Sequence, residues 1–98
     1  MTQQEIITQI VEIIQRKLPK SYRILLFGST AKGSASETAD LDIGILGSEE
    51  VPWETFLAIR REVDIIPTLR SIDVVDLLSV GDSFRQSALR SAKDLRNE

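Results

Sequence analysis

The sequence predicts a small α/β domain of the α+β type, in which a mixed sheet of about three strands is flanked by helices. Apolar residues recur at three- and four-residue spacing in some segments, and in short runs or at two-residue spacing in others. These segments alternate along the chain in the order α-β-α-β-α-β-α. The 98 residues contain no internal repeat and no long linker, so one domain spanning residues 1–98 is expected.

The first predicted helix begins at a capping box formed by Thr2 and Glu5 and ends at Pro19. Its apolar stripe is wide, which indicates that it packs on a sheet. Residues 22–27 form a short apolar run that ends at a glycine, a pattern typical of a strand covered on both faces.

The next segment, Gly-Ser-Thr at residues 28–30, turns the chain. Ser29 or Thr30 is predicted to cap a short helix that runs through Lys32 and stops at Gly33. A Gly-Ser pair after a strand is often only a turn. Alternatively, the N-terminus of a helix offers unpaired N–H groups that favour an anion such as phosphate. The segment is not a P-loop, because the Lys-Ser/Thr pair that a P-loop requires is absent.

Residues 34–39 show no apolar periodicity and are predicted to form a loop. In residues 40–46 the apolar period becomes two, which predicts a strand with two different faces. The apolar face consists of Leu41, Ile43 and Ile45. The opposite face consists of Asp40, Asp42 and Gly44. At the glycine a ligand is expected to be able to lie close to the backbone.

The second half of the chain is predicted to contain a helix between Pro52 and Pro67, a strand over residues 71–78, and a last helix capped by Asp82 or Ser83. The residues that continue the first of these helices at helical spacing are Trp53, Phe56, Leu57, Arg60, Val63 and Ile66. The inward stripe expected for the last helix is Phe84, Ala88, Ala92 and Leu95.

Alternation places Asp40 and Asp42 on one face of their strand, with Cβ atoms roughly 6.5–7 Å apart. Two carboxylates this close repel each other unless a cation lies between them, and a divalent cation such as Mg²⁺ prefers such oxygen ligands. The alternative is that both side chains simply face solvent at the start of a strand. The neighbouring Gly-Ser turn favours the metal, because a metal site and a phosphate turn together form one reaction centre.

Composition limits the other possibilities. The chain has no cysteine and no histidine, which excludes disulfides, thiolate metal sites and imidazole catalysis. A net charge of −3 gives no general attraction to nucleic acid, so direct nucleic-acid binding is not expected. No apolar stretch approaches the length of a membrane span and no signal peptide is visible, so a cytoplasmic location is expected.

Residues 27–33 (Phe-Gly-Ser-Thr-Ala-Lys-Gly) and 39–43 (Ala-Asp-Leu-Asp-Ile) resemble the motif of the polymerase-β-like nucleotidyltransferase superfamily. The chain is similar in length and element order to its minimal nucleotidyltransferase (MNT) branch. Two positions differ from the usual pattern: Ala39 stands where many members have serine, and Lys32 where many have arginine.

This resemblance implies that Gly28, Ser29 and Lys32 hold the triphosphate of ATP or another nucleoside triphosphate. It further implies that two Mg²⁺ ions are bound by carboxylates, in the two-metal manner of phosphoryl-transfer enzymes. The residues that would serve as ligands and in catalysis are Asp40, Asp42 and Asp73. Asp76 on the same predicted strand is the alternative for the third carboxylate.

MNT domains resemble the antitoxin halves of two-gene pairs whose partner is a helical HEPN toxin, so the implied reaction is transfer of AMP to a hydroxyl of that partner. The alternative is an inactive subunit that neutralises its partner by binding alone. The wide stripes of the helices over residues 5–18 and 84–95 are expected to cover the sheet face away from the aspartates. Surplus apolar residues such as Ile7 or Leu89 would remain exposed for the partner or for a homo-oligomer. The last helix also carries basic residues that could meet an acidic surface or simply be solvated. These are Arg85, Arg90, Lys93 and Arg96.

Overall fold

The structure is a computed structural model of the chain, and it describes residues 1–33 and 40–96. Its elements are α1 (Gln3–Lys17), β1 (Arg23–Phe27), α2 (Gly28–Lys32), β2 (Leu41–Leu46), α3 (Trp53–Asp64), β3 (Ile72–Asp76), α4 (Asp82–Arg90) and β4 (Lys93–Asp94). The predicted loop over residues 34–39, with Ala39 in it, lies outside the described residues. No helix in the described ranges is both long enough and apolar enough to cross a membrane.

The α+β fold class predicted from the sequence is confirmed, with one strand more than expected. The sheet has the order β3-β2-β1-β4, in which β1 pairs antiparallel with both β2 and β4, and β2 pairs parallel with β3. The last helix was expected to continue to Leu95, but α4 ends at Arg90 and the following residues pair with β1 as β4. Lys93 and Arg96 therefore do not lie on a helix.

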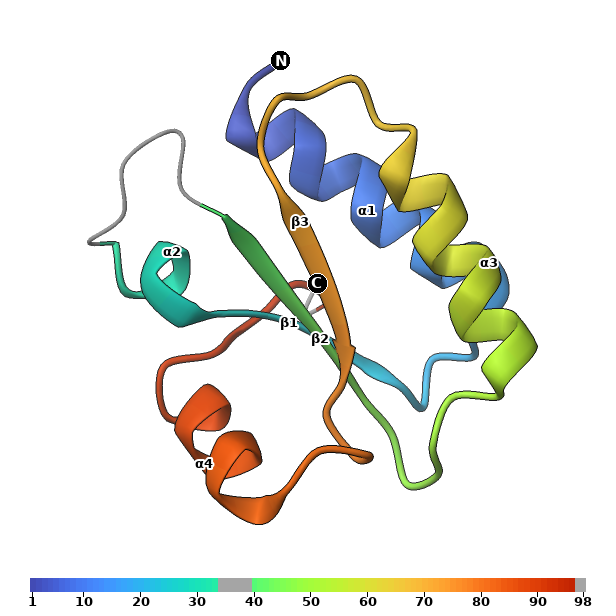
Figure 1. The fold of residues 1–98 in the computed structure, drawn as a ribbon, viewed down its shortest axis with the longest axis vertical. Coiled ribbons are helices and arrows are strands. Elements are labelled where there is room, and N and C mark those ends of the chain that lie inside the picture. The colour runs from blue at the N-terminus through green and yellow to red at the C-terminus, as the bar shows by residue number, and fades with distance from the viewer. Residues whose placement is uncertain (34–39, 97–98) are drawn as a thin grey trace.

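The helices α1 and α3 lie side by side on one face of the sheet (Figure 1). The capping box of α1 is present as predicted, with the Thr2 hydroxyl and the Glu5 carboxylate each accepting from the other's backbone N–H. Ile10 and Ile14 of α1 are fully buried there, as are Ile43 and Ile45 of β2. This face is therefore a closed apolar core, and the inward alternation predicted for β2 is confirmed.

The helix α4 covers the opposite face of the sheet (Figure 1), whereas Ala31 of α2 belongs to the first core. The prediction that the first and last helices share one face is therefore wrong: Ala88 of α4 packs with Leu25, Phe27 and Leu77, on the face that carries Asp42. This second core is much smaller than the first, because α4 is short and mostly polar. An amphipathic stripe predicts that a helix packs, but it does not predict which face of a sheet it covers.

Two further expectations, the exposed apolar patch and the helix N-caps, are wrong in detail. Ile7 is 7% exposed and belongs to the core, and Leu89 packs against the second core, so neither forms a docking patch. Trp53, the first residue of α3, is 71% exposed. The N-caps of α2 and α4 are Phe27 and Gly81, and neither makes a side-chain capping bond.

Candidate functional site

The site begins at the sharp turn between β1 and α2. Gly28 has a φ angle of +77°, a left-handed conformation that side chains rarely adopt. A Cβ atom at this position would overlap Oδ2 of Asp42. The absence of a side chain at Gly28 therefore lets the backbone of the turn lie against a carboxylate of the neighbouring strand.

Sheet register brings the second aspartate of β2 beside an aspartate of β3. Asp42 pairs with Phe27 on one side and with Asp73 on the other, so these three side chains share the face that α4 covers. Adjacent strands lie about 4.8 Å apart, which makes the two carboxylates close neighbours. Asp40, just before β2, lies two residues away on the same strand path.

Electrostatics at this position oppose ionisation. Partial burial raises the pKa of Asp42 above its usual value, and the charges of Asp73 and Asp40 raise this pKa further. The three aspartates thus act on one another as like charges. A cation placed among them would remove the repulsion.

Asp76, the alternative third carboxylate, lies on the other face of β3 because it is an odd number of residues from Asp73. Its Oδ2 accepts a hydrogen bond of 2.8 Å from the Val51 N–H, and its Oδ1 accepts one of 3.1 Å from the Leu78 N–H. Asp76 therefore fixes the chain before α3 and after β3, and the geometry brings Asp73, not Asp76, next to Asp42.

The Thr30 side chain links the short helix α2 to the residue just before β2. Thr30 was a candidate cap for its own helix, but its hydroxyl donates a 3.0 Å hydrogen bond to the carbonyl oxygen of Asp40. Thr30 is buried, unlike its neighbour Ser29. The helix ends at Gly33 with a φ of +75°, as predicted.

Beside the turn lies a hollow of about 170 Å³ between α2 and α4, lined in part by Gly28, Lys32, Ser87 and Ser91. Lys32 is exposed, so its ammonium group is available to an anion at the turn. Phe84 of α4 also lines the hollow; it is 49% exposed, and its ring meets the edge of Phe27 at a centroid distance of 6.0 Å. The predicted phosphate residues Gly28, Ser29 and Lys32 thus lie on the same short element.

Comparison with known proteins decides the family. The sequence model of the family described as "Polymerase beta, Nucleotidyltransferase" matches residues 8–98. The chain belongs to this nucleotidyltransferase family. The resemblance inferred from residues 27–33 and 39–43 is thereby confirmed, whereas no curated protein matches the chain.

Solved structures similar to this nucleotidyltransferase chain include toxin–antitoxin complexes. One is a crystal structure of a toxin–antitoxin with AMP-PNP, with 26% identity and a TM-score of 0.66 over 91% of this chain and 71% of the other. Another is a tri-AMPylated Shewanella oneidensis HEPN toxin in complex with an MNT antitoxin, with 26% identity and a TM-score of 0.64 over 96% and 71% of the two chains. A protein described as a minimal nucleotidyltransferase has 22% identity and a TM-score of 0.68 over 92% and 89%, which supports the fold alone.

The donor set of the site suits a hard divalent cation, because it consists of carboxylate oxygens held near one another. Among residues 1–33 and 40–96, however, no group of three or more acidic side chains is close enough to hold one ion as it stands. Asp40 and Asp73 are exposed, and only Asp42 is held against the Gly28 backbone.

Gly44 does not have the role expected for it. A Cβ atom here would lie 2.5 Å from Cδ1 of Leu77 and 3.4 Å from Cε1 of Phe27, so these side chains already cover the glycine. Gly44 thus makes room for the second core and leaves no space for a ligand against the backbone. The candidate ligand residues of this segment are therefore Asp42 in β2 and Asp40 just before it.

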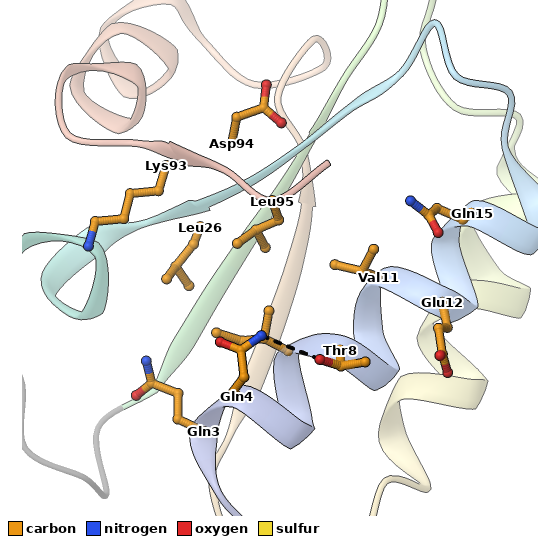
Figure 2. Close-up of a pocket in the computed structure, with 11 residues that line it drawn as sticks. Gln3, Gln4, Thr8, Val11, Glu12, Gln15, Leu26, Lys93, Asp94 and Leu95 are labelled. Atoms are coloured by element: carbon orange, nitrogen blue, oxygen red, sulfur yellow. Dashed lines mark hydrogen bonds between the residues drawn. The ribbon is translucent and has the colours of Figure 1, made fainter. Parts of the chain in front are cut away.

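A second hollow, of about 550 Å³, lies away from the aspartates, between α1 and the end of the chain (Figure 2). Gln3, Gln4 and Thr8 line it from α1, and Leu26 and Leu95 face them from β1 and the residues after β4. Gln4 donates a hydrogen bond of 3.4 Å to Thr8 within this wall. The side chains lining the hollow are mostly uncharged amides, hydroxyls and aliphatic groups, and its charged residues are Glu12, Lys93 and Asp94.

Proposed function

We propose that this nucleotidyltransferase chain is a magnesium-dependent adenylyltransferase that transfers AMP from ATP to a hydroxyl of a HEPN-type protein partner, and thereby acts as an antitoxin. The observation that carries the proposal is the register of Asp42 with Asp73, directly beside the Gly28 turn. A phosphate-sized anion at the turn and cations at the aspartates would lie next to each other. The likeness to toxin–antitoxin structures with AMP-PNP and with an AMPylated toxin supports the choice of nucleotide and partner.

In this proposal Gly28, Ser29 and Lys32 bind the triphosphate. Gly28 forms the turn beside Asp42, and the exposed Lys32 ammonium group at the end of α2 neutralises part of the phosphate charge. Asp40, Asp42 and Asp73 are the residues that would hold two Mg²⁺ ions. The raised pKa of Asp42 fits this role, because a bound cation would relieve the repulsion that raises it.

The reaction is an in-line displacement at the α-phosphorus of ATP. The acceptor oxygen forms a bond to the α-phosphorus, the bond to the bridging oxygen of the β-phosphate breaks, and pyrophosphate leaves with the electron pair. Asp73 takes the proton of the acceptor hydroxyl, since it is the exposed carboxylate on the outer strand. Bound Mg²⁺ would supply charge neutralisation for the attacking and leaving oxygens.

The test is mass spectrometry of a purified HEPN-type partner after incubation with this chain, ATP and magnesium. The expected result is covalently attached AMP on a hydroxyl side chain of the partner. Asp40→Asn should prevent the transfer, whereas Asp64→Asn, an exposed aspartate at the end of α3, serves as the matched control and should leave it unchanged. A partner that is inhibited without gaining AMP would replace the proposal with neutralisation by binding alone.

A further inference from the structure

The outer edge of the sheet at β3 has backbone groups that bind nothing else in the described structure. β3 is a terminal strand, and its residues at odd positions bond to β2, as the bonds from Leu41 N to Ser71 O and from Leu77 N to Ile45 O show. The N–H and C=O groups of Ile72 and Val74 therefore point outward, and within residues 1–33 and 40–96 they have no hydrogen-bond partner. Such an edge is a template for another extended strand.

An aromatic ledge stands beside this edge. Trp53 at the start of α3 is 71% exposed, and its ring stacks on Phe56 at a centroid distance of 6.4 Å and an interplanar angle of 19°. Both rings line a groove of about 370 Å³ that β3 completes with Val74 and Val75. A large exposed aromatic ring next to a free strand edge costs solubility in an isolated protein and is typical of an interface.

The charge around the groove is negative. Glu50 lines the groove and Glu54 follows Trp53, and both are exposed. Asp76 also lines it, although its carboxylate is already engaged by backbone N–H groups. Two copies of this edge paired with each other would bring identical acidic rims together, which electrostatics disfavours. A segment with lysine or arginine side chains is complementary.

We propose that the β3 edge and the Trp53–Phe56 ledge bind an extended, basic segment of the protein partner as an added strand. The outward N–H and C=O groups of β3 would form hydrogen bonds with an extended backbone. The rings of Trp53 and Phe56 would contact an apolar side chain of the segment, and Glu50 and Glu54 would pair with its lysine or arginine side chains. The docking does not depend on the proposed transfer. If the transfer occurs, however, a strand added here lies about 4.8 Å from β3. A hydroxyl of that strand on the α4 face would then be beside Asp73, so the same edge would deliver the acceptor.

The test uses a short, end-capped peptide of alternating valine and lysine with a central serine, titrated into the full chain by calorimetry. The basic peptide should bind, while the same peptide with glutamate in place of lysine should not. Trp53→Ser should weaken the binding about tenfold, as expected for an exposed aromatic anchor. Leu69→Ser is the matched control, because Leu69 is fully exposed but does not line this groove, and this change should have no effect.

Two further measurements separate this site from other contacts. Hydrogen exchange of the Ile72 and Val74 amides should slow when the basic peptide binds. Glu50→Lys with Glu54→Lys should reverse the preference, so that the glutamate peptide binds in place of the lysine one. The proposal is overturned if the basic peptide does not bind. It is also overturned if hydrogen exchange is unchanged at both amides, or if Trp53→Ser and Leu69→Ser have equal effects on binding. The affinity for Mg-ATP, measured separately on the same variants, should be unchanged. If the wild-type chain does not bind Mg-ATP, that result counts against the proposed function and not against the docking of the peptide.

Discussion

The two faces of the sheet differ in what their side chains do. Toward α1 and α3, the strands present fully buried aliphatic side chains such as Ile43 and Ile45, and the helices bury Ile10 and Ile14 against them. Toward α4, the same strands present Asp42 and a small apolar cluster. Stability is therefore concentrated on one face, which leaves the other face free to carry crowded charge.

The difference between the two faces follows from the two-residue period of a strand. Alternate residues of β2 point to opposite faces, so Ile43 can lie in the core while Asp42 beside it lies in the site. The carboxylate is held in a position that burial and like charges disfavour, as its raised pKa indicates. The core on the other face offsets this cost.

The largest effect on stability is expected from the core face. Ile10→Ala should lower the free energy of unfolding by about 2–5 kcal/mol, since it removes a fully buried side chain and leaves a cavity. Urea unfolding measures the change, and Ile10→Val should lower the stability by only about 0.5–1.5 kcal/mol. At temperatures where the variant is folded, its affinity for Mg-ATP should match that of the wild type. A loss of affinity in the folded variant would show that the two faces are not independent.

The next effect should come from Gly28→Ala, which affects stability and the site together. The substitution strains a backbone at φ +77° and forces Asp42 to move, so it should cost about 1–3 kcal/mol and weaken Mg-ATP binding. Gly33→Ala is the matched control, because Gly33 has a φ of +75° but no atom of residues 1–33 and 40–96 lies within 4 Å of the added Cβ. It should destabilise the protein without changing Mg-ATP affinity. Equal affinities in the two variants would contradict the contact between Gly28 and Asp42.

A smaller effect is expected at the link between α2 and β2. Thr30→Val keeps the size of the side chain but removes the hydrogen bond to the Asp40 carbonyl, which should cost about 1 kcal/mol. Because this bond positions the first aspartate, Mg-ATP affinity should fall as well. Thr30→Ser keeps the hydroxyl and should restore the affinity even if it restores the stability only in part. Failure of serine to restore it would assign Thr30 to packing alone.

The smallest effect, with the opposite sign, is expected from Asp42→Asn in the metal-free protein. Since the folded-state pKa of Asp42 is raised above its unfolded value, its ionisation destabilises the fold, and stability is lost as the pH rises through that folded-state pKa. The variant should therefore be more stable than the wild type at neutral pH, and the gain should vanish below the unfolded-state pKa of about 3.9. Urea unfolding at the two pH values measures this. Lower stability of the variant at neutral pH would make Asp42 a structural residue.

Much of the fold could be predicted from periodicity and end signals. The capping box fixed the start of α1, and alternation in β2 separated Asp42 from its apolar neighbours. The side of the sheet covered by α4 could not be predicted, because it depends on tertiary packing. The two residues of β4 have no local pattern, and they form a strand only because β1 offers them a free edge.

The sequence names candidate residues for the site, but it does not determine how they are arranged. The choice between Asp73 and Asp76 depends on which face of β3 each occupies, and that requires the register with β2. The cover over Gly44 comes from Leu77, more than 30 residues away, and no local pattern contains this contact. Thr30 resembled a helix cap in the sequence, but its hydroxyl bonds to the carbonyl oxygen of Asp40, 10 residues along the chain.

The central claim is that the α4 face of the sheet binds nucleotide through cations held by its aspartates. Calorimetric titration of the wild-type chain with ATP, once with magnesium and once with EDTA, tests it most directly. ATP should bind far more tightly with magnesium, and Asp42→Asn in magnesium should bind no better than the wild type in EDTA. Equal affinities of the wild-type chain in magnesium and in EDTA would contradict the claim.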